Sequence, residues 1–88
     1  MTHELKIWPR FLAQVLDGSK PFEIRCNDRN YRVGDYLRMH EWDPQTKQFG
    51  GTRVTVLVQS LVTNHLGLTP GYCVMGTQIT KVEENVPV

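Results

Sequence analysis

The stretch Gly18-Ser19-Lys20-Pro21-Phe22-Glu23-Ile24-Arg25 decides how this chain folds, because it ends one element and begins another of a different kind. Glycine favours the left-handed conformation that closes a helix. The residues from Pro21 to Cys26 then predict a strand, in which neighbouring side chains face opposite sides. Glu23 and Arg25 are expected on one face, beside Lys20. The other face, which we expect to point into the core, carries Phe22, Ile24 and Cys26.

Upstream of this stretch the spacing of apolar residues changes from a strand period to a helical period. Residues 2–7 alternate, with His3, Leu5 and Ile7 on one side, which predicts a short strand. A helix is then predicted from about Pro9 to Asp17, with proline in its first turn. The helix is expected to bury an apolar stripe made of Trp8, Phe11, Leu12, Val15 and Leu16.

Downstream the chain shows period-two segments separated by turn residues. Residues 27–33 predict a loop closed by Gly34-Asp35, and strands are predicted at about 36–42, 52–62 and 72–82. Gly76 interrupts the last strand, where a bulge or bend is expected. The sequence therefore predicts one α+β domain over residues 1–88. It would be a small barrel of about five mostly antiparallel strands with the helix packed at one opening.

Composition limits the class of function. A net charge of +1 excludes a nucleic-acid-binding protein that works by bulk charge, although five basic residues between 20 and 38 allow a local basic patch. Two distant cysteines do not form a disulfide framework, and no signal peptide or membrane-spanning run is visible. We therefore expect a cytoplasmic protein with reduced thiols. The histidines lack zinc-ligand spacing, so no metal and no cofactor are expected.

The motif Gly18-x-Lys20-x-x-Glu23-x-Arg25, in this order of elements, resembles that of the ASCH domain, a member of the PUA-like β-barrel superfamily. The chain is also similar to a small bacterial and phage group of unknown function, the DUF3850 type, over nearly its whole length. The segments that carry this second resemblance are His3–Pro9, Phe22–Arg25, Asn27–Arg29, Val33–Asp35, Glu41–Pro44 and Pro70–Tyr72.

The resemblance implies recognition of RNA or a modified nucleoside in a cleft beside the helix, at the strand that carries the motif. In this hypothesis Arg25 holds a phosphate or base edge through its planar fork, Lys20 binds phosphate, and Glu23 orients Lys20. Trp42 is the better candidate for stacking a base. The ligand-binding set is completed by Arg29 and Tyr72. The leading hypothesis is thus a monomeric domain that binds RNA or a nucleotide-like ligand.

Two other classes of function stay open. Some ASCH proteins deacetylate acetylcytidine and others are reported to cut single-stranded RNA; in an enzyme of this kind Lys20 would be the base and Glu23 its proton partner. The amidohydrolase branch, however, has threonine where this chain has Glu23. Its catalytic glutamate comes from a helix for which the connection between Val62 and Tyr72 is too short, so we expect little deacetylation. The third class is a phage or mobile-element protein that binds a host protein.

Overall fold

The elements of the computed structural model, which describes residues 1–87, confirm the predicted order of one early helix among five strands. They are β1 (Thr2–Ile7), α1 (Pro9–Asp17), β2 (Phe22–Cys26), β3 (Tyr36–Asp43), β4 (Gln48–Thr63) and β5 (Tyr72–Glu83). Helix α1 has its predicted bounds. Strand β4 begins earlier than predicted, so the β3–β4 connection is a tight turn. Val88 lies outside the described residues.

The two ends of α1 are set by local backbone geometry. Trp8 is extended, and its carbonyl accepts hydrogen bonds from the N–H groups of Phe11 and Leu12. Gly18 adopts a left-handed φ of 85°, and its N–H donates to the Val15 carbonyl. A helix of nine residues is marginal in isolation. Its packing against the sheet must therefore stabilise it.

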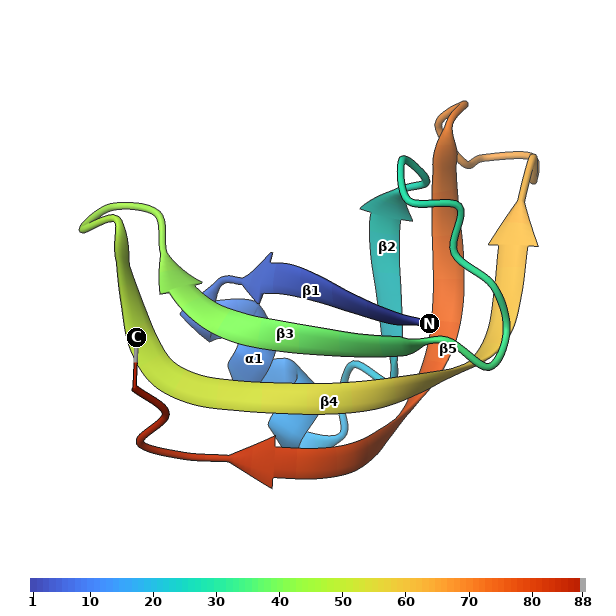
Figure 1. The fold of residues 1–88 in the computed structure, drawn as a ribbon. Helices are drawn as coiled ribbons and strands as arrows, with labels where there is room; N and C mark the ends of the chain where they lie inside the picture. Colours follow the sequence, from blue (N-terminus) through green and yellow to red (C-terminus); the bar gives the residue numbers. More distant parts are fainter. Residues whose placement is uncertain (88) are drawn as a thin grey trace.

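The strands form a single mixed sheet in the order β1-β3-β4-β5-β2. The β1–β3 pair is parallel and the other three pairs are antiparallel, so the mostly antiparallel prediction holds with one exception. Figure 1 shows the sheet curling around α1 as a half-barrel. Within residues 1–87, β1 and β2 are edges that share no ladder. The predicted closed barrel is therefore confirmed only as a curled, open sheet.

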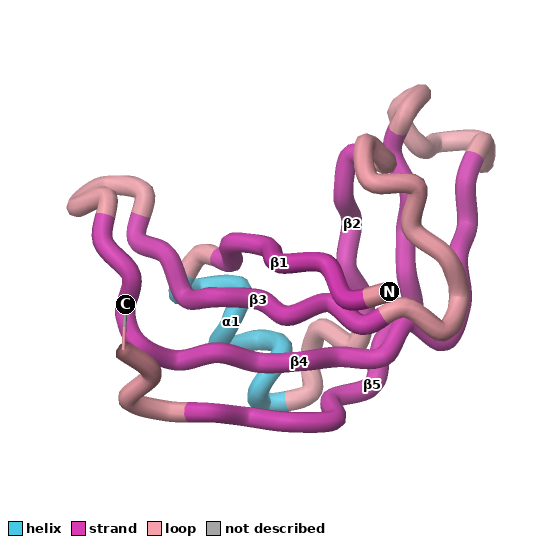
Figure 2. The backbone as a smooth tube through the Cα atoms, viewed as in Figure 1, coloured by secondary structure: helices cyan, strands magenta, loops and turns pink. Residues whose placement is uncertain are grey.

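The curl depends on irregular pairing between β4 and β5. The register shifts between Thr55 and Val56, and again between Val58 and Ser60. Ser60 lies opposite Gly76, where a Cβ atom would collide with the serine hydroxyl. In Figure 2 both long strands bend in this half of the sheet. The irregularity expected at Gly76 is thus present, although β5 continues through it, because a bulge bends a strand without ending it.

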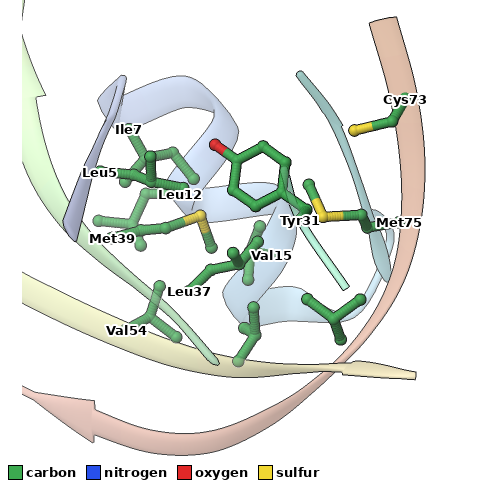
Figure 3. Close-up of a cluster of buried hydrophobic side chains, with 12 residues drawn as sticks. Leu5, Ile7, Leu12, Val15, Tyr31, Leu37, Met39, Val54, Cys73 and Met75 are labelled. Carbon is green, nitrogen blue, oxygen red and sulfur yellow. The ribbon is translucent and has the colours of Figure 1, made fainter. Parts of the chain in front are cut away.

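The core lies between α1 and the concave face of the sheet (Figure 3). Strand β1 buries every second side chain, as predicted. Strand β3 alternates in the same way at Leu37 and Met39, and its side chains after Met39 are only partly buried. One cluster contains the buried apolar residues Leu5, Ile7, Leu12, Val15, Tyr31, Leu37, Met39, Val54, Val56, Val58, Cys73 and Met75.

Two residues of the predicted helical stripe do not belong to this core. Trp8 is 46% exposed and Leu16 is 41% exposed, so their predicted burial is wrong. The sheet covers only one side of α1, the side that carries Leu12 and Val15. Trp8 lies just before the helix and stacks on Phe11 instead, with ring centroids 5.7 Å apart.

The faces of β2 are the reverse of the prediction. Ile24 is 53% exposed, and Phe22 and Cys26 are exposed as well, whereas Glu23 is only 3% exposed. Pairing with β5 is the reason, because Glu23 lies opposite Met75, which is fully buried. Directly paired residues share a face of the sheet, so register overrides the apolar pattern of this short strand.

A buried polar pair connects β1 to the turn before β3. His3 Nε2 donates to Asp35 Oδ2 at 2.8 Å, and the Arg32 N–H donates to the same oxygen at 3.0 Å. The Met1 nitrogen lies 3.2 Å from Asp35 Oδ1. These bonds, first that from His3 and then that from Arg32, hold the pKa of the Asp35 carboxyl below its ordinary value of 3.8.

This shift predicts a loss of stability in acid. Because the folded-state pKa of Asp35 is depressed, the stability that its carboxylate contributes is fully present above the ordinary pKa of 3.8. That stability is lost as pH falls through the folded-state pKa. Asp35→Asn should cost about 1–3 kcal/mol at neutral pH, because the amide nitrogen must face a donor in either orientation, the Met1 ammonium or the His3 and Arg32 N–H groups. Denaturant titrations across pH should show the variant converging on wild type in acid. A constant difference down to the lowest pH would contradict the assignment.

Candidate functional site

The candidate site is the open gap between β1 and β2, the two edges of the sheet. Arg25 Nη2 donates to the carbonyl of Lys6 at 3.0 Å, so one side chain joins the two sheet edges. A cavity lies on each side of this connection, and both are lined by residues of β1 and β2. The gap therefore combines an irregular shape with polar groups from both edges.

A buried carboxylate organises the charged residues of the gap. Glu23 Oε1 accepts a bond from Lys20 Nζ at 2.5 Å, and Glu23 Oε2 accepts one from Arg25 Nε at 2.9 Å. The Glu23 side chain is 4% exposed, while those of Lys20 and Arg25 are 16% and 23% exposed. A carboxylate buried this deeply needs such partners. In return it holds both cations in position.

The chain before β2 delivers Lys20 to this carboxylate. After the left-handed Gly18, the Lys20 N–H donates to the Gln14 carbonyl at 3.1 Å, which ties the connection to the last turn of α1. The Pro21 carbonyl then accepts from the Thr77 N–H on β5. The helix stop and the strand start that the sequence shows are thus what places Lys20 beside Glu23.

The helix cavity, as we call the smaller one, has a volume of about 360 Å³. Aromatic rings of Trp8 and Phe11, stacked on each other at an interplanar angle of 23°, line it on the α1 side. Three cations and one carboxylate contribute its charge. This combination of an aromatic surface and excess positive charge suits a flat ligand that carries an anionic group. The charged lining residues are Lys6, Lys20, Glu23 and Arg25.

The loop cavity, about 720 Å³ in volume, lies beyond Arg25 toward residues 26–31. Its polar lining mixes donors and acceptors, and Glu4 in it already accepts bonds from Arg38 at 3.0 Å and from His40 at 2.7 Å. Unlike the helix cavity, it is not dominated by cations. Its titratable lining residues are Glu4, Lys6, Arg25, Cys26, Asp28, Arg29, Tyr31 and His40.

An aromatic pair on β3 and β4 lies beside the gap. Trp42 and Phe49 meet edge to face with centroids 4.8 Å apart. The Lys6 ammonium lies 3.9 Å from the Trp42 ring centroid, a cation–π contact. Within residues 1–87, Lys6 has no carboxylate partner. Its charge is therefore held in place by an aromatic ring and remains available to a ligand.

The structure brings together four of the six residues proposed from the sequence to bind a ligand. Lys20, Glu23 and Arg25 line the helix cavity, and Arg29 joins Arg25 in the loop cavity. The other two lie elsewhere. Trp42 packs against Lys6 and Phe49, while Tyr72 pairs with Cys26 on the outer face of the sheet. Neither Trp42 nor Tyr72 is among the residues that line the two cavities.

Three residues of the gap are not in the ligand-binding set that the sequence predicts. Lys6 lies on the outward face of β1, as alternation predicts. Its place in the gap also requires β1 to be an edge strand, which depends on parallel pairing with β3 that no local pattern reveals. Phe11, which the helical stripe predicts in the core, is partly buried and packs against the core, and it also lines the helix cavity. Tyr31 comes from a loop, where the Asn27 side chain accepts a bond from its N–H.

Features that would support hydrolysis or metal chemistry are few in the described part of the chain. Residues 64–71, between β4 and β5, form turns and contain no helix. Both oxygens of Glu23 are bonded to cations, which fits an anchor better than a proton shuttle. No group of three or more metal-ligating side chains occurs in residues 1–87. In the same residues, α1 is the one helix, and it is not of a length or polarity to cross a membrane.

Comparison with known proteins gives two findings. A family model described as "Domain of unknown function (DUF3850)" matches residues 2–77, which include β1, α1, β2, β3, β4 and the start of β5. An "Uncharacterized 12.9 kDa protein in GpA 3′region" from Escherichia phage P2 is 48% identical over 40 residues. This alignment covers 46% of the present chain but only 37% of the phage protein. Neither description includes an activity.

Proposed function

This chain belongs to the DUF3850 family, and we propose that it binds single-stranded RNA or a nucleotide-like ligand in the gap between β1 and β2. The observation that carries the proposal is the anchored pair of cations. Lys20 and Arg25 are both bonded to the buried Glu23, so their donors are fixed before a ligand arrives. Preorganised charged donors beside an aromatic wall match the phosphate and the base of a nucleotide.

The aromatic wall supports a nucleotide over a simple anion. Phosphate alone would use only the cations, whereas Trp8 and Phe11 add a flat apolar surface to the same cavity. Exposed tryptophan at a cavity is a typical stacking platform for an unpaired base. Base stacking tolerates different sequences, so the proposal predicts weak sequence preference and strong dependence on salt.

We also propose that the curled sheet is a PUA-like fold of the ASCH type. Its support is the early helix and the position of the Gly18-x-Lys20-x-x-Glu23-x-Arg25 motif, which lines the cleft beside that helix. A monomer in a reducing cytoplasm is part of the same proposal. Cys26 and Cys73 are free thiols, and burial raises the pKa of the Cys73 thiol, which keeps it unreactive.

RNA binding is tested by removing cations that line the gap without disturbing Glu23's bond to Arg25. In fluorescence anisotropy with a labelled oligouridine, Lys6→Gln/Lys20→Gln should weaken binding at low salt by about tenfold or more, because charge-assisted contacts to phosphate are lost. The slope of log affinity against log salt should fall by about 0.7 for each phosphate contact removed.

A matched control removes two lysine charges at positions away from the gap. Lys47 is in the β3–β4 turn and Lys81 is 66% exposed on β5, and neither is a lining residue of the two cavities. Lys47→Gln/Lys81→Gln should leave both affinity and slope nearly unchanged. Equal losses in the two double variants, or no RNA binding by the wild type at low salt, would reject the gap as an RNA site.

A further inference from the structure

We infer that the gap binds two linked nucleotides, one in each cavity, with their connecting phosphodiester at Arg25; this rests on the proposed function and specifies its ligand. The inference begins with the residues that the two cavities share. Only Lys6 and Arg25 line both cavities, and both are cations. Positive charge is therefore placed at the boundary, where a chain that passes from one cavity to the other carries its negative phosphodiester.

The geometry of Arg25 fits a position between two subsites. Its Nε is bonded to Glu23 and its Nη2 to the Lys6 carbonyl, so two of its three nitrogens are bonded to the protein. Within residues 1–87 the third nitrogen, Nη1, has no hydrogen-bond partner. The guanidinium is thus held across the gap with one donor group left for an anion.

The loop cavity presents a buried hydroxyl that the fold itself does not use. Tyr31 is 3% exposed, and its ring packs edge to face against His3 with centroids 4.8 Å apart. Figure 3 shows its hydroxyl pointing away from Cys73 and Met75. Among residues 1–87 the Tyr31 hydroxyl has no hydrogen-bond partner. In the same residues, every side-chain nitrogen or oxygen that is fully enclosed has a partner, so the Tyr31 hydroxyl is not fully enclosed. The hydroxyl must therefore keep access to the cavity that Tyr31 lines.

The remaining polar groups of the loop cavity suit a neutral nucleoside better than a second phosphate. Arg29 is a cation there, but Asp28 contributes an acceptor, and Glu4 is bonded to Arg38 and His40. Mixed donors and acceptors match the edges of a base and the sugar hydroxyls. Carboxylates on this side repel phosphate, which also favours the phosphodiester at Lys6 and Arg25.

The size of the two cavities agrees with two subsites. Their volumes of about 360 and 720 Å³ each lie within the usual range for small-molecule pockets, about 300–1,000 Å³. A single mononucleotide in the helix cavity would leave the loop cavity and the Tyr31 hydroxyl without a ligand. Joining two weakly held nucleosides makes the second binding event intramolecular, which raises the total affinity without new contacts.

Three uridine probes test the inference by isothermal titration calorimetry on the whole chain: uridine monophosphate, the dinucleotide UpU, and UpU with an uncharged methylphosphonate linkage. UpU should bind at least about tenfold more tightly than the mononucleotide. The uncharged linkage should lose most of that gain. Tyr31→Phe should weaken UpU by about fivefold, the effect of one lost hydrogen bond, without changing mononucleotide binding.

Tyr31→Phe is a matched variant because the ring and its packing are kept and no intramolecular hydrogen bond is lost. Its denaturation midpoint should equal that of the wild type. Equal affinity for mononucleotide and UpU, with the Lys6→Gln/Lys20→Gln loss still present, would overturn the two-subsite inference and leave the proposed function intact. Tighter UpU binding that ignores Tyr31→Phe would also overturn it, since the second nucleotide would lie outside the loop cavity. Absence of binding by every probe and by oligouridine would reject the function itself.

Discussion

Glu23→Ala is expected to lower the free energy of unfolding by about 3 kcal/mol, the lower end of the range for breaking a buried ion pair. The reason is that removing the carboxylate leaves two partly buried cations without their shared partner. Lys20 and Arg25 are three-quarters or more buried and would lose their shared partner. Denaturant titration measures the effect. Binding of RNA should fall as well, because the two cations would no longer be held in one position.

The ion pair of Arg53 and Glu83, whose carboxylate is more exposed than that of Glu23, is the control for this experiment. Arg53 donates two bonds to Glu83, at 3.0 and 2.7 Å, and this hydrogen bonding lowers the pKa of the Glu83 carboxyl. Both side chains are 24% exposed, and neither lines the two cavities. Glu83→Ala should therefore cost clearly less than Glu23→Ala and leave RNA binding unchanged. If the two variants lose the same stability, Glu23 is not the anchor described here.

Leu12→Ala should destabilise the protein by about 2–5 kcal/mol, the usual cost of removing a buried leucine. Leu12 is 4% exposed and packs in the cluster that α1 forms with the sheet. Because α1 has only nine residues, it depends on this contact for its own stability. Since Phe11 and Trp8 lie on the same helix end, loss of α1 would also disturb the helix cavity.

Leu16 provides a comparison within the same helix. It lies one turn after Leu12 and is 41% exposed, so Leu16→Ala should cost less than about 1 kcal/mol. Both variants make the same chemical change and have the same helix propensity, which leaves burial as the difference. Chemical denaturation followed by circular dichroism would separate them. A loss below about 1 kcal/mol for Leu12→Ala would show that α1 does not dock as described.

Local patterns predicted the elements of this fold well. The bounds of α1 follow from Pro9 and Gly18, whose backbone preferences act within one turn and need no partner. The inward faces of β1 and β3 follow from alternation, because each of these strands buries one face against α1. Gly76 marks the irregular part of the sheet for a similar local reason, since a Cβ at this position would collide with the Ser60 hydroxyl as it now points.

Local patterns predicted the wrong buried residues where one side of a strand or helix is not covered by the rest of the protein. In β2 the apolar residues Phe22 and Ile24 alternate with charges, and alternation alone says nothing about which set is buried. The apolar pattern predicts that Phe22 and Ile24 face the core, whereas pairing with β5 buries Glu23 and partly buries Arg25. Trp8 is a second case, because a half-barrel leaves one side of α1 uncovered.

Some features of the candidate site likewise follow from local sequence, and others depend on long-range pairing. The composition of the cleft motif and its place between a helix stop and a strand follow from the sequence alone, because Lys20, Glu23 and Arg25 lie within six residues and their spacing is a local property. The burial of Glu23 and the position of β1 across the gap follow from how the strands pair. Lys6 and Tyr31 line the site because of that arrangement. Lys6 lies 19 residues before Arg25 in the sequence, and Tyr31 lies in a loop. Such contacts depend on the parallel pairing of β1 with β3 and on the curl of the sheet, and long-range pairing leaves no periodic trace in a single strand.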